Sequence, residues 1–145
     1  MVRKLALGFG LVFVVVVALG WMPQCISATH MTPDGIERTM FGLFALTMLD
    51  DITHGVTALV LIAAGLHSQR ASVVAFTAFG WYYACDAAFF LLNGFFNDKP
   101  WAADIMLNMP HVILSSVMLA IAYWLAPREA AGAARGSRVG GPAVA

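Results

Sequence analysis

Polar and ionisable side chains recur at helical spacing inside segments that are otherwise apolar. Around residues 47–57 they stand at offsets of 0, 3, 4, 7 and 10, which is one face of a helix. That face comprises Thr47, Asp50, Asp51, His54 and Thr57. A second face comprises Asp104, Asn108, His111 and Ser115, and a shorter one comprises Tyr82, Tyr83, Asp86 and Asn93. These faces predict a polar network or ligand site whose members are Asp50, Asp51, His54, Asp86, Asn108 and His111.

Three kinds of chemistry are open to these residue types. Imidazole and carboxylate ligands suit zinc or iron, and a haem iron takes axial histidines, so His54 and His111 are candidate ligands of a divalent metal or a haem. No ligand-spacing motif accompanies them, and we therefore expect no metal and no cofactor. Asp86 with a histidine is a candidate proton relay. The structural alternative is that Asp86 pairs with His54 or His111 and that the polar groups hydrogen-bond between helices.

The composition indicates that the elements holding these residues lie in a membrane. Of 145 residues, 61% are hydrophobic and 11% are charged, whereas soluble domains are about 25% charged. The mean hydropathy is +0.81 and the net charge is zero. These values exclude a disordered chain, a nucleic-acid binder and an ordinary cytosolic enzyme. No catalytic motif for acyl or phosphoryl transfer or for zinc proteolysis occurs.

Four apolar segments are long enough to cross the hydrocarbon core as helices, which takes about 20 residues. We expect spans at about 5–22, 41–66, 71–96 and 102–125, which form an all-α, four-helix transmembrane domain over residues 1–126. Residues 127–145 are rich in Ala and Gly and predict a disordered cytoplasmic tail.

The basic residues predict the orientation. Six of them fall on the side of the two termini, whereas only Arg38 and Lys99 fall on the other side. By the positive-inside rule both termini are cytoplasmic, in a plasma (inner) membrane. The alternative is that the first span is a cleaved signal peptide, because Arg3-Lys4 precede it and Ile26-Ser27-Ala28 follow it. Cleavage would leave three spans.

With this orientation the polar faces lie in the outer half of the membrane, and the inner half is almost purely apolar. The sequence therefore predicts a polar pocket that opens outward. It also suggests a parallel repeat of two helical hairpins, because residues 48–54 align with residues 105–111. In that alignment Asp51 faces Asn108, and His54 coincides with His111.

Several short motifs carry a family resemblance. They are Leu7–Phe13, Gly20-Trp21-Met22-Pro23, Phe41-Gly42-Leu43-Phe44, His54-Gly55-Val56 and the later His111. Over about residues 5–125 the chain resembles a family of small bacterial four-span membrane proteins known only as a domain of unknown function. The resemblance implies four spans in a bacterial inner membrane and no established activity. Asp86 and Pro110 depart from that pattern. In size and layout the chain is also similar to DoxX-like proteins, some of which are linked to quinone-dependent oxidoreductase complexes.

The leading functional hypothesis is a non-enzymatic accessory or assembly subunit whose polar outer-half pocket fixes helix packing. The first alternative is a redox or metal- or haem-linked protein that uses His54 and His111. The second is a proton or small-solute transporter that uses Asp86. The expected partners are the lipid bilayer and other membrane subunits or further copies of the chain, and no nucleic acid.

Overall fold

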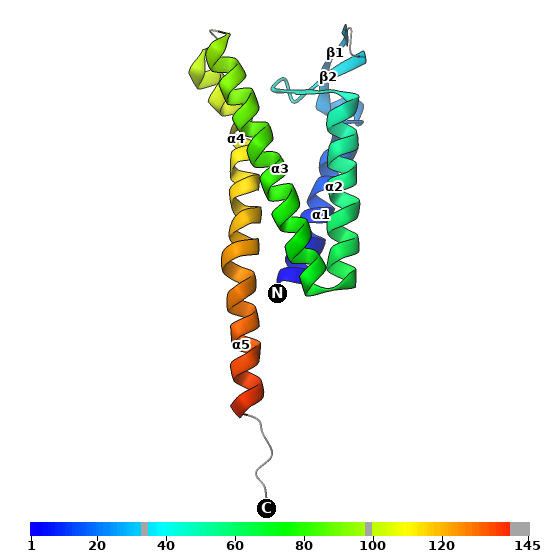
Figure 1. The fold of residues 1–145 in the computed structure, drawn as a ribbon. Coiled ribbons are helices and arrows are strands. Elements are labelled where there is room, and N and C mark those ends of the chain that lie inside the picture. The colour runs from blue at the N-terminus through cyan, green and yellow to red at the C-terminus, as the bar shows by residue number, and fades with distance from the viewer. Residues whose placement is uncertain (33–34, 98–99, 140–145) are drawn as a thin grey trace, which may run out of the picture.

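The computed structural model describes residues 1–32, 35–97 and 100–139, and most of these residues are helical (Figure 1). The helices are α1 (Val2–Leu19), α2 (Met48–His67), α3 (Gln69–Phe96), α4 (Trp101–Ala120) and α5 (Ala126–Val139). A 3₁₀ turn, η1 (Pro23–Cys25), follows α1, and a π-helical turn, η2 (Ile121–Leu125), joins α4 to α5.

Four of the described helical segments are long and apolar enough to cross a membrane. They are Val2–Leu19, Met48–His67, Gln69–Phe96 and Ile105–Ala134. Large apolar side chains such as Leu59, Val74 and Phe89 are exposed on their outer faces, which is the arrangement that lipid requires. The prediction of a multi-pass membrane protein is therefore confirmed.

The helices pack as two close pairs, α1 with α2 and α3 with α4, which contact each other less extensively (Figure 1). Glycines permit the close approach within each pair. A Cβ added at Gly10 of α1 would lie 2.6 Å from Ile62 Cγ1 and 3.0 Å from the Ala58 carbonyl oxygen, both on α2. A Cβ added at Gly80 of α3 would lie 2.8 Å from Leu119 Cδ2 on α4. That the pairs are sequence repeats stays a prediction.

The expected all-α fold is confirmed for the four long helices but is wrong for residues 26–46, and the second span does not begin at residue 41. Residues 26–46 form a three-stranded antiparallel sheet with the order β1 (Ile26–Thr32), β2 (Gly35–Met40) and β3 (Phe44–Leu46). Phe41 and Gly42 both have positive φ (54° and 71°) and turn the chain between β2 and β3. Thr47 then caps α2 in a reciprocal capping box with Asp50, and this cap fixes the start of the helix at Met48.

The expected disordered tail is also wrong over the part that the structure describes. Residues 126–139 continue the fourth span as α5, and residues 140–145 lie outside the described residues. Pro127 would normally break such a helix, because its ring meets the carbonyl of the fourth residue before it. The π turn η2, in which the Ala126 amide donates to the Ile121 carbonyl, widens the helix just before that proline. Alanine-rich sequence then favours continued helix.

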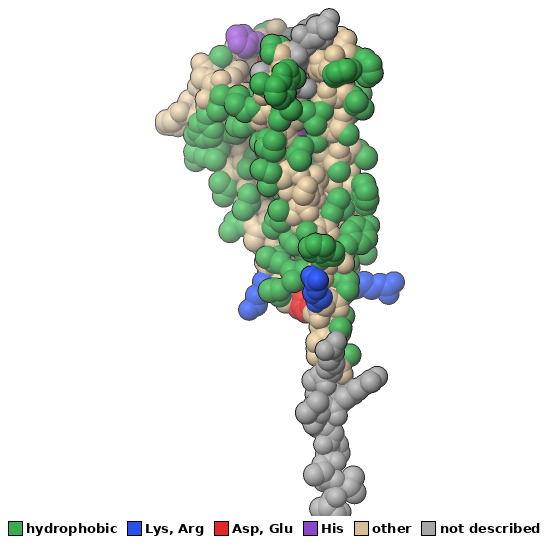
Figure 2. Space-filling model, turned by 90° about the vertical axis from the view of Figure 1, so that its left-hand side faces the viewer, with side chains coloured by type: hydrophobic (Ala, Val, Ile, Leu, Met, Phe, Trp, Pro, Cys, Tyr) green, Lys and Arg blue, Asp and Glu red, His purple; other side chains and the backbone are tan. Residues whose placement is uncertain are grey.

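The two ends of the bundle differ in structure and charge. The sheet lies at one end, here called the sheet end, and the N-terminus and α5 lie at the other, here called the tail end (Figure 1). Lysine and arginine side chains gather in a band at the tail end (Figure 2). One of them, Arg3, donates hydrogen bonds to the carbonyl oxygens of Gly65 (2.9 Å) and Leu66 (2.7 Å) and so caps the C-terminus of α2.

Candidate functional site

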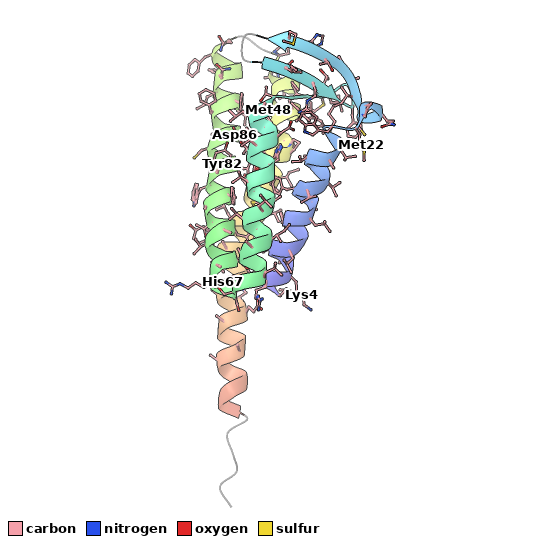
Figure 3. The ribbon with its side chains drawn as sticks, turned by 90° about the vertical axis from the view of Figure 1, so that its right-hand side faces the viewer. Lys4, Met22, Met48, His67, Tyr82 and Asp86 are labelled. Carbon is pink, nitrogen blue, oxygen red and sulfur yellow. The ribbon has the colours of Figure 1, made fainter. Side chains whose placement is uncertain are left out.

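A hydrogen bond joins His111 of α4 to Asp86 of α3. The distance from His111 Nδ1 to Asp86 Oδ2 is 2.7 Å, and the side chains are 30% and 24% exposed. Asp86 and its neighbour Tyr82 lie in the half of the bundle nearer the sheet, whereas His67 and Lys4 mark the tail end (Figure 3). The sequence predicted a histidine partner for Asp86 and left His54 and His111 open, and the structure selects His111.

Tyr83 is the centre of an aromatic and polar cluster that involves all four spans. Its ring stacks on Phe13 of α1 (centroids 5.6 Å apart) and on His54 of α2 (6.3 Å), and it lies 5.3 Å from His111 of α4. Its hydroxyl lies 3.0 Å from Thr57 Oγ1. Because Thr57 donates its own proton to the Thr53 carbonyl (2.8 Å), Tyr83 is the donor to Thr57. We call Phe13, His54, Thr57, Tyr83, Asp86 and His111 the Tyr83 cluster.

Asp50 has a local structural role at the start of α2. Its carboxylate accepts hydrogen bonds from the amide and the hydroxyl of Thr47, both at 2.7 Å, and its own amide donates to Thr47 Oγ1. Carboxylates in the first turn of a helix also interact favourably with the helix dipole. Asp50 therefore serves helix initiation at the sheet end.

Asp51 pairs with Arg38 of β2, a partner that the sequence analysis missed. Arg38 donates to Asp51 Oδ2 and to the Gly20 carbonyl oxygen, and its guanidinium lies 4.1 Å from the ring centroid of Trp21. Arg38 and Asp51 are both buried. This contact ties the sheet to α1 and α2. Arg38 is the single Lys or Arg residue among residues 23–46, and this was the signal available in the sequence.

The remaining candidate, Asn108, is buried on α4 one turn before His111. The side chain of Asp104, on the same predicted face, lies outside the described residues. The predicted polar face of α4 therefore does point into the bundle at Asn108 and Ser115, both of which are buried.

Residues 3–128 match a protein family described as Domain of unknown function (DUF4383). The chain belongs to the DUF4383 family. The match includes the sheet, all of α1 to α4 except Val2, and the whole Tyr83 cluster, and it confirms the predicted membership of a family of unknown function. No curated protein and no solved structure matches the chain.

The geometry of this DUF4383 chain does not favour a haem between His54 and His111. Their ring centroids are 6.3 Å apart, and the buried Tyr83 ring completes a packed triangle with them. A flat macrocycle would need the space that Tyr83 takes. Nor do three or more His, Cys, Asp or Glu residues come together as a metal site within the described part of the chain.

The Tyr83 cluster ends the ionisable part of the bundle. No Asp, Glu, Lys, Arg or His occurs between His54 and His67, between Arg70 and Asp86, or between His111 and Arg128. Toward the tail end the core is formed by apolar side chains such as Phe76, Leu61 and Met118. Ionisable groups therefore reach from the sheet end to His54, Asp86 and His111 and resume only at the tail end, and the polar side chains buried between them are hydroxyls such as Ser72 and Ser115.

We expect Tyr83→Phe to lower the free energy of unfolding by about 1 kcal/mol, the net value of one hydrogen bond. The variant removes only the hydroxyl that donates to Thr57, and the ring contacts remain. Unfolding of the purified protein in mixed micelles, followed by circular dichroism, measures the change. Tyr82→Phe is the matched control, because Tyr82 is exposed. Equal effects of the two substitutions would contradict a special role for Tyr83.

Proposed function

We propose that this DUF4383 chain is a non-enzymatic accessory or assembly subunit of a bacterial plasma membrane, with both termini cytoplasmic. One observation carries the proposal: the acidic candidate residues Asp50, Asp51 and Asp86 all contact other side chains of the same chain. Asp50 caps α2, Asp51 pairs with Arg38, Asp86 pairs with His111, and Tyr83 donates to Thr57. Side chains arranged in this way hold helices together and leave few groups for a substrate.

The position of the Tyr83 cluster supports the same role. Apolar burial drives helix association weakly within a lipid bilayer, so packing and polar contacts must select the arrangement of helices. The cluster provides both kinds of contact at one depth, with residues from each of the four spans. A fixed arrangement of spans presents a constant surface to lipid and to other membrane subunits.

A second candidate function is the binding of a proton or small ligand at Asp86 and His111 from the sheet end. The partial exposure of both side chains favours it. Transport across the whole membrane is less well supported, because ionisable groups are missing from the spans between the Tyr83 cluster and the tail end.

Two measurements on the full chain test these alternatives. First, the tagged chain is extracted from its native membrane in mild detergent, and native mass spectrometry reports what it carries. If the proposal is correct, a second membrane protein co-purifies with this 15.5 kDa chain in a constant molar ratio. Second, in proteoliposomes with an internal pH dye, we expect the same low proton leak for the wild type and for Asp86→Asn.

Two results would overturn the proposal. A proton flux that Asp86→Asn abolishes would establish transport. A Soret band or a stoichiometric metal that is lost in His111→Ala would establish the redox or metal alternative. The accessory role instead predicts that His111→Ala lowers the free energy of unfolding by about 0.6–1.7 kcal/mol, the range for polar contacts between membrane helices.

A further inference from the structure

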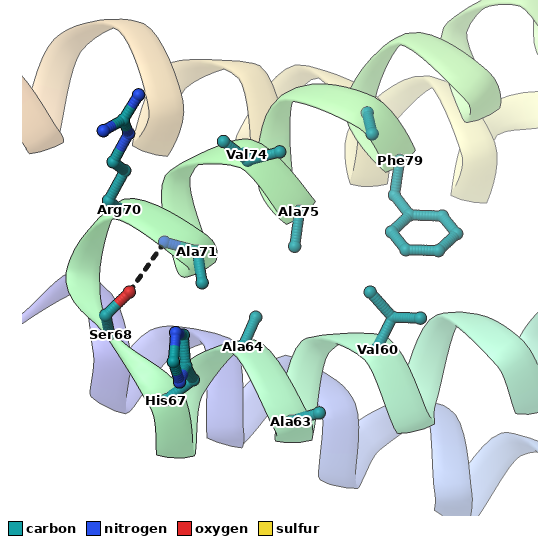
Figure 4. Close-up of a pocket in the computed structure, with 11 residues that line it drawn as sticks. Val60, Ala63, Ala64, His67, Ser68, Arg70, Ala71, Val74, Ala75 and Phe79 are labelled. Atoms are coloured by element: carbon teal, nitrogen blue, oxygen red, sulfur yellow. Dashed lines mark hydrogen bonds between the residues drawn. The ribbon is translucent and has the colours of Figure 1, made fainter.

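A groove opens to the outside between α2 and α3 at the tail end, away from the Tyr83 cluster (Figure 4). Its volume is about 730 Å³, which is within the range of about 300–1,000 Å³ for small-molecule sites. Alanines form much of its wall, and Ala64 and Ala75 point toward each other from the two helices (Figure 4). Side chains this small leave the space between the helices unfilled.

The length of the groove corresponds to one leaflet of a bilayer. Along α3 it extends from Arg70 to Phe79, roughly 14 Å at the helical rise of 1.5 Å per residue. Half of the hydrocarbon core is about 15 Å thick. Val60 and Phe79 line the end of the groove that lies farthest from the turn between α2 and α3. The wall between that end and the turn is apolar. An extended acyl chain has both the length and the chemistry to lie there.

The mouth of the groove is basic. Arg70 and His67 lie at the end where the two helices join, and both are exposed (Figure 4). Within the described part of the chain Arg70 has no ion-pair partner. The N-terminus of α3 begins beside it at Gln69, directly after the C-terminus of α2 at His67, so the opposite dipole ends of the two helices meet there and the positive charge of the mouth comes from the side chains.

We propose that this groove binds an anionic glycerophospholipid of the leaflet at the tail end. One acyl chain lies between α2 and α3, and the phosphate is held by Arg70 and His67. Charge complementarity selects this occupant, because basic pockets between transmembrane helices suit anionic headgroups. A neutral lipid gains the apolar contact alone. The inference is independent of the proposed function, since it concerns other residues at the opposite end of the bundle.

The test is lipid retention by the full chain in detergent, measured by native mass spectrometry with added phosphatidylglycerol or phosphatidylcholine of identical acyl chains. We expect the wild type to prefer phosphatidylglycerol. Arg70→Gln should reduce that preference about fivefold, the contribution of one basic residue near an anionic lipid surface. Ala78→Phe fills the groove and should reduce the retention of both lipids.

Matched controls separate the site from general effects. Lys4→Gln removes an exposed charge at the same end, and Ala88→Phe adds the same ring on an exposed position of α3 outside the groove. Both should behave like the wild type. The proposal is overturned if no preference for phosphatidylglycerol exists, or if Lys4→Gln weakens the preference as much as Arg70→Gln. It is also overturned if Ala78→Phe converts a dimer to a monomer without changing lipid retention, because a second copy would then occupy the groove.

Discussion

Replacing Arg38 with leucine should lower the free energy of unfolding by about 3–5 kcal/mol, the range for removing one partner of a buried ion pair. The substitution leaves the buried Asp51 carboxylate without its cation and the Gly20 carbonyl without its donor. It also removes the stacking on Trp21. We therefore expect the sheet to detach from α1 and α2. Unfolding in mixed micelles and protease sensitivity of residues 26–46 measure the two effects.

Two further variants identify the cause. Arg38→Lys keeps the positive charge but loses the planar guanidinium group, which donates to two acceptors at once. It should therefore be more stable than Arg38→Leu and less stable than the wild type. The double variant Arg38→Leu/Asp51→Leu removes both charges and should be more stable than Arg38→Leu alone. A double variant as unstable as the single one, or an Arg38→Leu protein with wild-type stability, would show that the ion pair does not hold the sheet.

The second large effect is expected for Gly10→Val, which should lower the free energy of unfolding by about 3 kcal/mol, at the upper end of the usual cost of overpacking. A Cβ at this position would lie 2.6 Å from Ile62 Cγ1, and it would also meet backbone atoms of Ala58 and Ile62 at 3.0 and 3.1 Å. Backbone atoms in a helix cannot rotate away as a side chain can. The α1–α2 pair must therefore separate to admit the valine.

Gly8→Val is the matched control for this substitution. Gly8 is on the same helix two residues earlier, and a Cβ built there meets nothing within 4 Å. The two variants share the change in helix propensity and differ in packing, so their difference in unfolding free energy isolates the clash. A difference below about 0.5 kcal/mol, the usual size of a surface effect, would contradict the close approach of α1 and α2.

The spans and much of the Tyr83 cluster could be predicted from the sequence because apolar length and helical spacing are local properties. The partnership of Asp86 with a histidine followed from the cost of an unpaired charge in a membrane. The choice of His111 over His54 depends on how α3 and α4 pack, which no single segment encodes. The role of Arg38 escaped prediction for the same reason: its partners Gly20 and Asp51 come from two other elements.

The sheet and α5 were missed for different reasons. The sheet has a local signal, since β-branched residues such as Ile26, Thr29 and Thr39 flank Pro33-Asp34-Gly35, a typical turn sequence. The sheet was nevertheless missed, because the apolar residues that begin at Phe41 were assigned to the start of the second span. In the tail, Pro127 and several glycines favoured disorder, and only the widened turn η2 lets the helix continue past the proline.

This continuity makes the last part of the chain a single rod. From Trp101 to Val139, α4, η2 and α5 follow one another without a break and extend roughly 58 Å at 1.5 Å per residue. A bilayer with its headgroups is about 40–45 Å thick, so the rod projects beyond it. His111 near one end and Glu129 near the other belong to the same continuous helical segment. The two ends of this segment therefore contact two different parts of the bundle: His111 contacts Asp86 of α3, and Glu129 contacts the N-terminal amine of Met1.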